Sequence, residues 1–192
     1  MSFPFYKQLD AMDCGPTCLR MITKHFGRSY SLGLLREWCY IEREGVSLLG
    51  ISDAAERVGL RTMAVKINYT LLCDEAPLPC IVHWNQNHFV TVYKINKTHV
   101  WVADPASGQY KLKKEEFLKS WTAEQLFIAE NDTVFMGSNT QNAPIFIEKA
   151  LLNDEKQGIA LLIEPTPAFL TDDEYDDFLL KNSDGNDVKI RN

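Results

Sequence analysis

The sequence predicts an α+β fold in which N-terminal helices pack on an antiparallel sheet. Apolar residues recur at helical spacing in the first third of the chain, and β-branched and aromatic runs follow in the middle. Helices followed by a run of strands indicate an α+β domain, whereas alternating strands and helices would indicate a parallel sheet. The 192 residues, 45% apolar and 24% charged, are enough to bury a core and do not have the composition of a disordered chain.

Three helices are expected in the N-terminal third of the chain. The first covers residues 14–26, because Pro16 suits a first turn and Gly27 is typical of the residue that follows a helix. The second starts near Ser31, and the third covers about 47–58 before another glycine. The N-terminal third is therefore expected to be helical.

Strands are expected in the middle of the chain. Residues 81–84, 88–95 and 99–103 are rich in β-branched and aromatic side chains, and short polar turns separate them. This pattern predicts an antiparallel meander. A short amphipathic helix over 113–121 and a buried strand over 158–164 are expected after it.

Composition argues against several classes of protein. The net charge of −6 and the isoelectric point near 5.2 disfavour a nucleic-acid-binding protein, so no nucleic-acid partner is expected. The longest apolar run, 159–163, is far shorter than the ~20 residues that span a bilayer, and no secretory signal is visible. The expected location is the cytoplasm, where five cysteines, an odd number, indicate reduced thiols and not a disulfide framework.

Cys14 stands directly before the first turn of the first helix, within Asp13-Cys14-Gly15-Pro16-Thr17. A helix N-terminus presents unpaired N–H groups and partial positive charge, which favour a thiolate. Gly15 leaves bare backbone beside the sulfur, so that a substrate carbonyl could approach closely. Position alone fits equally well a buried cysteine that packs at a helix start.

A cysteine nucleophile needs a base and a group that orients the base. His25 lies in the helix that the cysteine opens and cannot fold back on it, and His99 follows a turn where exposure is expected. His83 and His88 remain as candidates. His88 starts a strand and Asp104 ends the neighbouring antiparallel strand, so these two side chains are expected to lie side by side.

Gln8 lies six residues before Cys14. A side-chain amide just upstream of a nucleophile can join its backbone N–H in stabilising an oxyanion. The order glutamine, cysteine, histidine and aspartate matches the papain-like arrangement, in which the cysteine heads a helix and its partners come from a sheet. The informative motifs, in chain order, are Gln8, Asp13-Cys14-Gly15, Cys18-Leu19, Met21-Ile22, His88-Phe89-Val90-Thr91-Val92-Tyr93 and Ala103-Asp104-Pro105.

These motifs, in this order, resemble the bacteriocin-processing cysteine peptidase domain at the N-terminus of peptidase-containing ABC transporters. The resemblance covers about 5–121, with a last strand at about 158–167. It implies a papain-like cysteine peptidase fold at the inner face of the cell membrane, as part of a transporter. It also implies cleavage of leader peptides from exported precursors after Gly-Gly or Gly-Ala, without a cofactor or a metal.

The resemblance implies a role for each candidate residue, carried over by matching position. Cys14 would be the nucleophile and His88 the general base. Asp104 would orient the imidazole, and Gln8 would complete the oxyanion hole. The expected partners are a precursor peptide with a helical double-glycine leader and the transmembrane and ATP-binding domains of a transporter. Two glycines at the cleavage site would suit a narrow tunnel that larger side chains cannot enter.

The expected domain organisation follows from the resemblance and from charge. Residues 1–170 are interpreted as one peptidase domain, with an insertion at about 122–157 because the flanking segments lie closer together in such transporters. Within it, 125–129 has the pattern of a strand. Residues 171–192, with seven acidic and three basic side chains, are interpreted as an acidic tail or linker toward missing transporter domains. An excised fragment and a separate peptidase both stay open.

Other functions compete with this interpretation. A non-cleaving relative of the same domain would only bind substrate, but such relatives usually lack the cysteine that is present here. An acyltransferase or transglutaminase would use the same residues and resolve the thioester with an amine. A redox site is suggested by Cys14-Gly15-Pro16-Thr17-Cys18, although its spacing departs from C-x-x-C, and a zinc site would need a second ligand pair.

Overall fold

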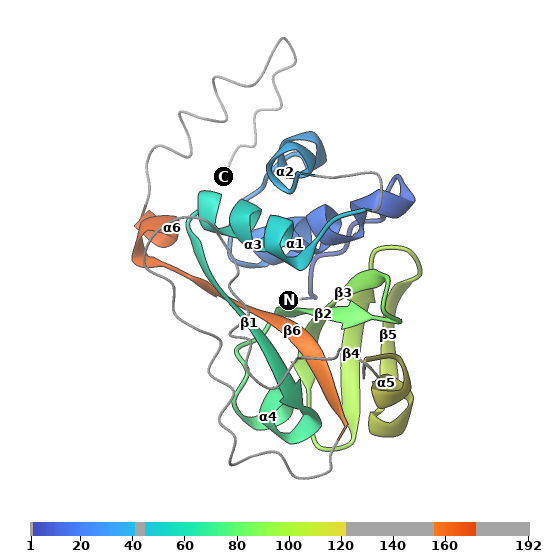
Figure 1. Ribbon diagram of the computed structural model, residues 1–192. Helices are drawn as coiled ribbons and strands as arrows, with labels where there is room; N and C mark the ends of the chain where they lie inside the picture. The colour runs from blue at the N-terminus through green and yellow to red at the C-terminus, as the bar shows by residue number, and fades with distance from the viewer. Residues whose placement is uncertain (1, 41–44, 122–155, 172–192) are drawn as a thin grey trace, which may run out of the picture.

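One six-stranded sheet with helices on both faces makes up the described part of the molecule (Figure 1). The computed structural model describes residues 2–40, 45–121 and 156–171. The helices are η1 (Ala11–Asp13), α1 (Cys14–His25), α2 (Leu32–Trp38), α3 (Leu48–Arg57), α4 (Tyr69–Asp74), α5 (Lys114–Trp121) and α6 (Pro167–Thr171). The strands are β1 (Leu60–Asn68), β2 (Cys80–Trp84), β3 (His88–Ile95), β4 (His99–Asp104), β5 (Gly108–Lys113) and β6 (Gln157–Pro165). In these three ranges we find no helix with the length and apolar character needed to cross a membrane.

The sheet has the strand order β1-β6-β2-β3-β4-β5, and each neighbouring pair is antiparallel. Consecutive strands β2 to β4 form the predicted meander, and β5 extends it by one further strand. Strand β6 comes from much later in the chain and lies between β1 and β2, where Leu161 pairs with Ile81. Helices followed by an antiparallel sheet confirm the α+β class.

Polar caps explain why the N-terminal helices begin near the predicted positions. The side chain of Ser31 accepts the N–H of Leu34 at the start of α2, and that of Ser47 accepts the N–H of Gly50 at the start of α3. Gly27 follows α1 with φ at +100°, a conformation that glycine adopts readily. These signals act within one turn, so the sequence predicts them well.

The sequence does not predict β1, α4, β5 or α6. Strands β1 and β5 lie at the two edges of the described sheet, and most of their residues are exposed or half-buried. Strand β5, for example, exposes Gln109, Lys111 and Lys113, as edge strands often do. Helices α4 and α6, of six and five residues, are too short for helical periodicity to be visible.

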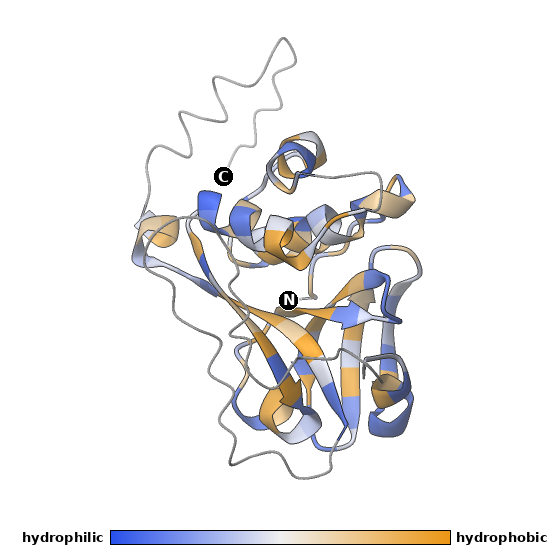
Figure 2. Ribbon diagram, viewed as in Figure 1, coloured by the Kyte–Doolittle hydropathy of each residue, from blue (hydrophilic) through white to orange (hydrophobic). Residues whose placement is uncertain are grey.

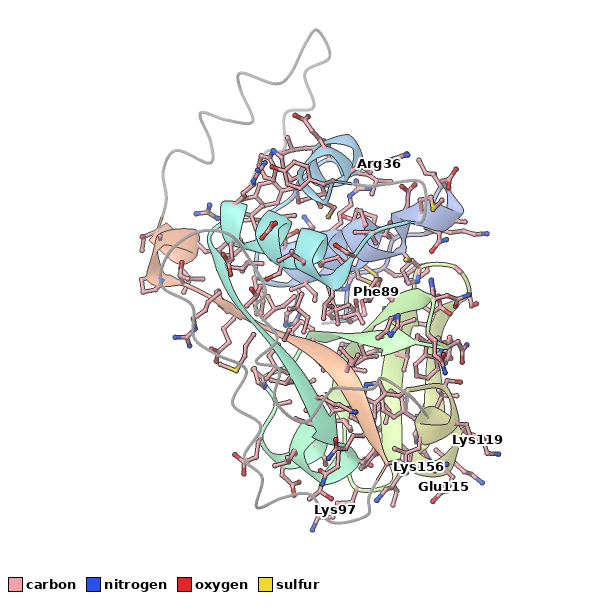
Figure 3. The ribbon with its side chains drawn as sticks, viewed as in Figure 1. Arg36, Phe89, Lys97, Glu115, Lys119 and Lys156 are labelled. Carbon is pink, nitrogen blue, oxygen red and sulfur yellow. The ribbon has the colours of Figure 1, made fainter. Side chains whose placement is uncertain are left out.

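Two apolar clusters hold the layers together, one on each face of the sheet, and the strands between them are largely apolar (Figure 2). The first cluster lies between the sheet and α1 to α3 and includes Leu19, Ile22 and Phe89. Figure 3 labels Phe89 between the helical layer and the sheet. The second lies beneath α4 and α5 and includes Phe117 and Trp121. Because the first cluster anchors α1 against β3 and β4, it also positions the N-terminus of α1.

Two predicted segments lie almost entirely outside the described residues. The insertion expected at about 122–157, with its strand at 125–129, is described only at its last two residues, and Gln157 already begins β6. The acidic tail expected at 171–192 is described only at Thr171. The division into peptidase domain, insertion and tail therefore stays a prediction.

Gly158 packs against the indole of Trp121, and we expect Gly158→Ala to destabilise the fold by about 1–3 kcal/mol. A Cβ at this position would lie within 2.6 Å of three indole atoms, and the ring is 2% exposed and cannot easily move aside. The indole N–H also donates to the carbonyl oxygen of Ile159, at 3.0 Å. Urea unfolding followed by circular dichroism measures the loss. Gly33→Ala is the control, because an added Cβ on this exposed residue of α2 meets nothing within 4 Å, and equal stability of the two variants would contradict the packing argument.

Candidate active site

Cys14 is the first residue of α1 and lies where the helical layer meets the ends of β3 and β4. The chain enters α1 through the single turn η1, which Asp10 caps by accepting the N–H of Met12 at 3.0 Å. The cysteine is 5% exposed, so most of its side chain is packed. Its place at the helix N-terminus is the one that the sequence predicts.

His88 opens β3 and Asp104 closes β4, and antiparallel pairing brings the two strand ends together. Nε2 of His88 lies 2.8 Å from Oδ1 of Asp104, so the predicted contact between them is present. The imidazole also hydrogen-bonds the side chain of Cys14. Because Nε2 faces the carboxylate, Nδ1 is the ring nitrogen that is left for the sulfur.

Asp104 accepts two further hydrogen bonds and is 4% exposed. The backbone N–H of Ala106 donates to Oδ1 at 2.8 Å, which is typical of an aspartate that begins a turn. The hydroxyl of Tyr110 donates to Oδ2 at 3.2 Å. Tyr110 was not among the predicted site residues, because it lies on the unpredicted strand β5. The signal that points to it is a strand that returns from the turn after Asp104.

The pKa values follow from these contacts. Burial by itself lowers the pKa of His88, but its hydrogen bonds and charge interactions with Asp104 and Cys14 outweigh burial and raise that pKa to about 9. Burial by itself raises the pKa of Asp104, but the hydrogen bonds from His88 and Ala106 lower it to about 2. Burial and the neighbouring carboxylate raise the pKa of Tyr110, which keeps its hydroxyl a donor. At neutral pH His88 and Asp104 together therefore hold a proton next to the sulfur of Cys14.

Gln8 lies beside the turn that follows Asp104. Its backbone N–H donates to the carbonyl oxygen of Pro105 at 3.0 Å, which ties the N-terminal segment to the end of β4. Its side-chain Oε1 is buried and has no hydrogen-bond partner within the described residues. Gln8 as a whole is half-buried, but a buried amide oxygen without a partner is uncommon in proteins, so this side chain has hydrogen-bonding capacity for a ligand.

The other histidines lie elsewhere. His25 lies near the C-terminal end of α1, and His99 lies at the end of β4 opposite to the carboxylate. The ring of His83 packs against Phe89, with the centroids 5.2 Å apart. His88 is therefore the histidine that the strand register brings to both the thiol and the carboxylate.

The other four cysteines are also free thiols. Cys18 is fully buried, donates to the carbonyl oxygen of Phe89 at 3.4 Å, and has a pKa that burial raises well above its usual value. Burial raises the pKa of Cys39 and of Cys80 to about 12, and Cys73 is half-buried. Residues 2–40, 45–121 and 156–171 contain no group of three or more His, Cys, Asp or Glu side chains that could hold a metal ion.

Gly15 is required for the packing of the helical layer, and its expected role toward a substrate stays a prediction. A Cβ at this position would lie 2.6 Å from side-chain carbons of both Val46 and Ile51. The missing side chain therefore makes room for α3 and the segment before it to pack on α1.

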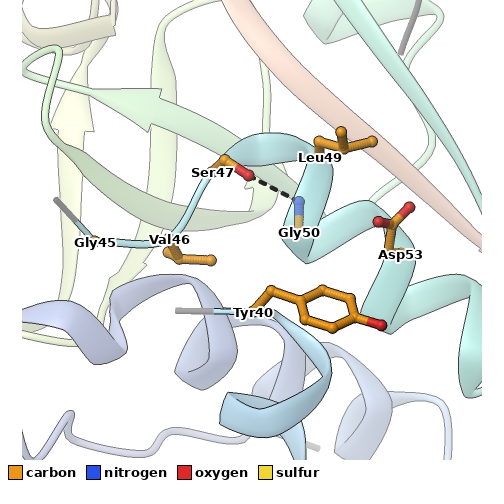
Figure 4. Close-up of a pocket in the computed structure, with 7 residues that line it drawn as sticks. All are labelled: Tyr40, Gly45, Val46, Ser47, Leu49, Gly50 and Asp53. Carbon is orange, nitrogen blue, oxygen red and sulfur yellow. Dashed lines mark hydrogen bonds between the residues drawn. The ribbon is translucent and has the colours of Figure 1, made fainter. Parts of the chain in front are cut away.

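A cavity of about 420 Å³ lies between the end of α2 and the start of α3 (Figure 4). Figure 4 shows Tyr40, Val46 and Asp53 around it, with the side chain of Ser47 accepting the N–H of Gly50. None of the four predicted site residues lines this cavity. The hydrogen-bonded group at Cys14 is thus a separate feature of the molecule.

Comparison with known families agrees with this geometry. The model of the Peptidase C39 family matches residues 2–133, more than half of the chain. The chain belongs to this family. As a C39 member it is a cysteine peptidase, and the resemblance predicted from the sequence motifs is confirmed.

Curated relatives of this C39 chain are much longer proteins. The lactococcin-G-processing and transport ATP-binding protein LagD of Lactococcus lactis subsp. lactis is 37% identical over 125 residues, which are 62% of this chain and 18% of LagD. The colicin V secretion/processing ATP-binding protein CvaB of Escherichia coli is 32% identical over 123 residues, which are 64% of this chain and 18% of CvaB. The chain therefore spans about a fifth of the length of the curated relatives that it matches.

Solved structures of C39 peptidase domains have the same fold. The crystal structure of a double glycine motif protease from an AMS/PCAT transporter, in complex with the leader peptide, has a TM-score of 0.65 and 27% identity, covering 86% of this chain and 93% of that one. The peptidase domain of Streptococcus ComA has a TM-score of 0.64 and 24% identity, and the alignment covers 86% of this chain and 100% of that one. At this identity the similarity concerns the fold alone. Together they confirm the papain-like cysteine peptidase fold.

The raised pKa of His88 predicts that its pair with Asp104 stabilises this C39 domain most at mildly acidic pH. The folded pKa of about 9 lies above the usual 6.5, so this contribution, of the order of 3 kcal/mol, is complete below pH 6.5 and is lost as the pH rises through 9. The contribution of Asp104, whose pKa falls from 3.8 to about 2, is present above pH 3.8 and is lost as the pH falls through 2. The two shifts largely describe one interaction and are not added.

Thermal unfolding of the wild type and His88→Gln measures this effect at about pH 5.5 and about pH 9.5. The stability difference between the two proteins should be largest at the lower pH and should shrink at the higher pH. A difference that stays constant between these conditions would show that the pair does not hold a proton as the contacts imply.

Proposed function

We propose that this chain is a cysteine endopeptidase that removes leader peptides from exported bacteriocin-like precursors after a double-glycine pair. The main support is the hydrogen-bonded series of Cys14, His88 and Asp104 where α1 meets the sheet. LagD and CvaB are both named as processing proteins, and the related structure with a bound leader peptide is named a double glycine motif protease. Acyl transfer through a thioester requires such a nucleophile, base and orienting group at one point.

In the proposed acylation step, His88 already holds the proton of Cys14, and the resulting thiolate attacks the carbonyl carbon of the second glycine. A C–S bond forms and the carbonyl oxygen becomes an oxyanion. As the C–N bond breaks, His88 gives its proton to the leaving nitrogen, so that the mature peptide departs as an amine. The leader stays on the enzyme as a thioester, and Asp104 keeps its hydrogen bond to Nε2 throughout.

In the proposed deacylation step, His88 is neutral and takes a proton from a water molecule. The resulting hydroxide attacks the thioester carbon, and the C–S bond breaks to restore the thiolate. The leader departs as a carboxylic acid, which releases its proton to the solvent and becomes a carboxylate. Cys14 and the protonated His88 are then restored. The step needs no metal, cofactor or nucleic acid.

Gln8 is proposed as the second donor of the oxyanion hole, beside the backbone N–H of Cys14. Its tie to Pro105 holds it near the end of β4, and its buried Oε1 has no partner within the described residues. The amide can therefore turn its N–H₂ group toward a developing oxyanion without breaking a hydrogen bond of Oε1 to any described residue.

The proposal includes a place in a larger assembly. LagD and CvaB are named as transport or secretion ATP-binding proteins, and the chain matches about a fifth of each. We therefore propose the transmembrane and ATP-binding domains of an ABC transporter as partners, and the inner face of the cell membrane as the location. Residues 1–170 would then be the peptidase domain, with an insertion at about 122–157, and residues 171–192 would lead toward the other domains.

Incubation with a precursor that carries a helical double-glycine leader tests the proposal. Mass spectrometry should find two products, a leader that ends in Gly-Gly and a mature peptide, with masses that fit addition of one water. An intact precursor at enzyme excess would favour the non-cleaving relative. An amine adduct of the leader would favour a transferase.

A second substrate series tests the narrow tunnel. Valine in place of the second glycine should lower kcat/KM at least about 10-fold, because its side chain must enter a space suited to glycine. The same substitution several residues beyond the cut is the control and should change kcat/KM little. Equal losses at both positions would contradict a tunnel at the cleavage site.

A further inference from the structure

We propose that Asp13, paired with Arg36, is a positioning residue that fixes the amide of Gln8 relative to the sulfur of Cys14. This inference rests on the proposed function, since it concerns the same site. Asp13 stands between the two groups in the sequence, and its side chain is 0% exposed although it carries a carboxylate. A buried carboxylate is costly unless it is hydrogen-bonded and paired, so its partners indicate what it holds in place.

The first partner of Asp13 is the turn that leads to the cysteine. Oδ2 of Asp13 accepts the N–H of Asp10 at 3.0 Å, and the side chain of Asp10 accepts the N–H of Met12 at 3.0 Å. The backbone N–H of Asp13 also donates to the carbonyl oxygen of Asp10, at 3.1 Å. This capping box spans residues 10–13, between Gln8 and Cys14, so it sets the path of the chain from the amide to the sulfur.

The second partner is Arg36 of α2, which Figure 3 places in the helical layer. Its Nε lies 3.2 Å from Oδ1 of Asp13, and its own side chain is 44% exposed. Oδ1 has no hydrogen-bond partner within the described residues, so Arg36 stabilises the negative charge of Asp13 mainly through electrostatic attraction. The ion pair joins the turn η1 to α2, which itself packs on α1 and α3.

The segment that carries Gln8 is therefore held at two points. One is the capping box at Asp13, and the other is the hydrogen bond from the N–H of Gln8 to Pro105. The side-chain Oε1 of Gln8 has no partner of its own in the described part of the chain, so the backbone on either side directs the amide. A loosened box would move the amide while leaving the contact between His88 and Asp104 in place.

Two variants test this role. Asp13→Asn keeps an oxygen for the N–H of Asp10 but removes the charge that faces Arg36, and Arg36→Gln removes the cation. Arg61→Gln is the matched control, because Arg61 pairs with Glu164 on the surface, with side chains 74% and 46% exposed. Thermal unfolding of each variant shows whether it folds. If one of Asp13→Asn and Arg36→Gln does not fold, the other is used for the test.

Two reagents separate positioning of the oxyanion hole from a general effect on the cysteine. A peptide aldehyde that ends in Gly-Gly forms an adduct whose oxygen occupies the oxyanion hole, whereas iodoacetamide alkylates the sulfur without one. We expect Asp13→Asn and Arg36→Gln to weaken aldehyde binding about 10- to 100-fold, since small displacements of a positioned group have effects of this size. Alkylation of Cys14, followed by mass spectrometry, should stay within about 3-fold of the wild type, and Arg61→Gln should change neither quantity.

A double-mutant cycle completes the test. In a Gln8→Ala background, Asp13→Asn should weaken aldehyde binding by no more than about 3-fold, because the group it positions is already gone. Losses that add fully, or alkylation that falls as much as aldehyde binding, would overturn the inference in favour of a structural role. A wild type that is alkylated but neither binds the aldehyde nor cleaves precursor would refute the proposed function, whereas normal aldehyde binding by both variants would refute only this inference.

Discussion

Cys14→Ala is expected to lower the rate of precursor cleavage by about 10⁵-fold, to a level near the background reaction. The alanine variant has no atom that can form the thioester, because Cys14 is the thiol that interacts with His88. Binding of the leader should persist, because the substitution removes one small and mostly buried group. Single-turnover reactions at enzyme excess measure the rate, and fluorescence anisotropy with a labelled leader measures the binding.

Cys18→Ala is the matched control for this experiment. Cys18 lies one turn further along α1, is fully buried, and donates to the carbonyl oxygen of Phe89. Its replacement should cost some stability but leave cleavage within a few-fold of the wild type. Cleavage that persists in Cys14→Ala, or a loss in Cys18→Ala as large as that in Cys14→Ala, would contradict the assignment of the nucleophile.

The second large effect is expected for His88→Ala, which should lower kcat by about 10³- to 10⁴-fold. The variant lacks the group that carries the proton to the leaving nitrogen and later takes one from water. Asp104→Asn should cost much less, about 10-fold, because a side-chain amide can still accept the hydrogen bond from Nε2, as in the Cys-His-Asn arrangement. Rapid-quench kinetics with saturating precursor measures kcat for each variant.

The dependence of activity on pH should also differ between Asp104→Asn and the wild type. Asp104 raises the pKa of His88 through its hydrogen bond and its charge. In Asp104→Asn the charge is lost, so the fall of activity with rising pH should begin at a lower pH than in the wild type. His83→Ala is the control and should leave kcat and its pH profile nearly unchanged. A profile that is the same in Asp104→Asn and the wild type would argue against the pair as the proton carrier.

Much of the helical layer could be predicted because its signals are local. The caps at Ser31 and Ser47 and the glycine after α1 act within a single turn, and the structure has helices at these places. The meander could be predicted for a related reason, since short turns force neighbouring strands to pair. The edge strands β1 and β5 could not, because their half-exposed residues carry little apolar signal.

Only part of the candidate site could be predicted in the same way. Cys14 is marked by the helix that it opens, and the contact of His88 with Asp104 follows from strand order. Tyr110 was not visible, since it reaches the carboxylate only through the pairing of β5 with β4. The pairing of Asp13 with Arg36 was equally invisible, because nothing in either segment indicates that α2 lies beside η1.

By itself, the sequence determined the fold class, the cysteine at a helix N-terminus and the membership of a peptidase family, since these depend on local periodicity and ordered motifs. The tertiary structure decided which histidine reaches the thiol, why Gly15 must lack a side chain, and what holds the carboxylate of Asp104. It also placed β6 between β1 and β2, although a long segment separates it from the other strands. The physical reason is that these features depend on contacts between residues far apart in the chain, and no local pattern records such contacts.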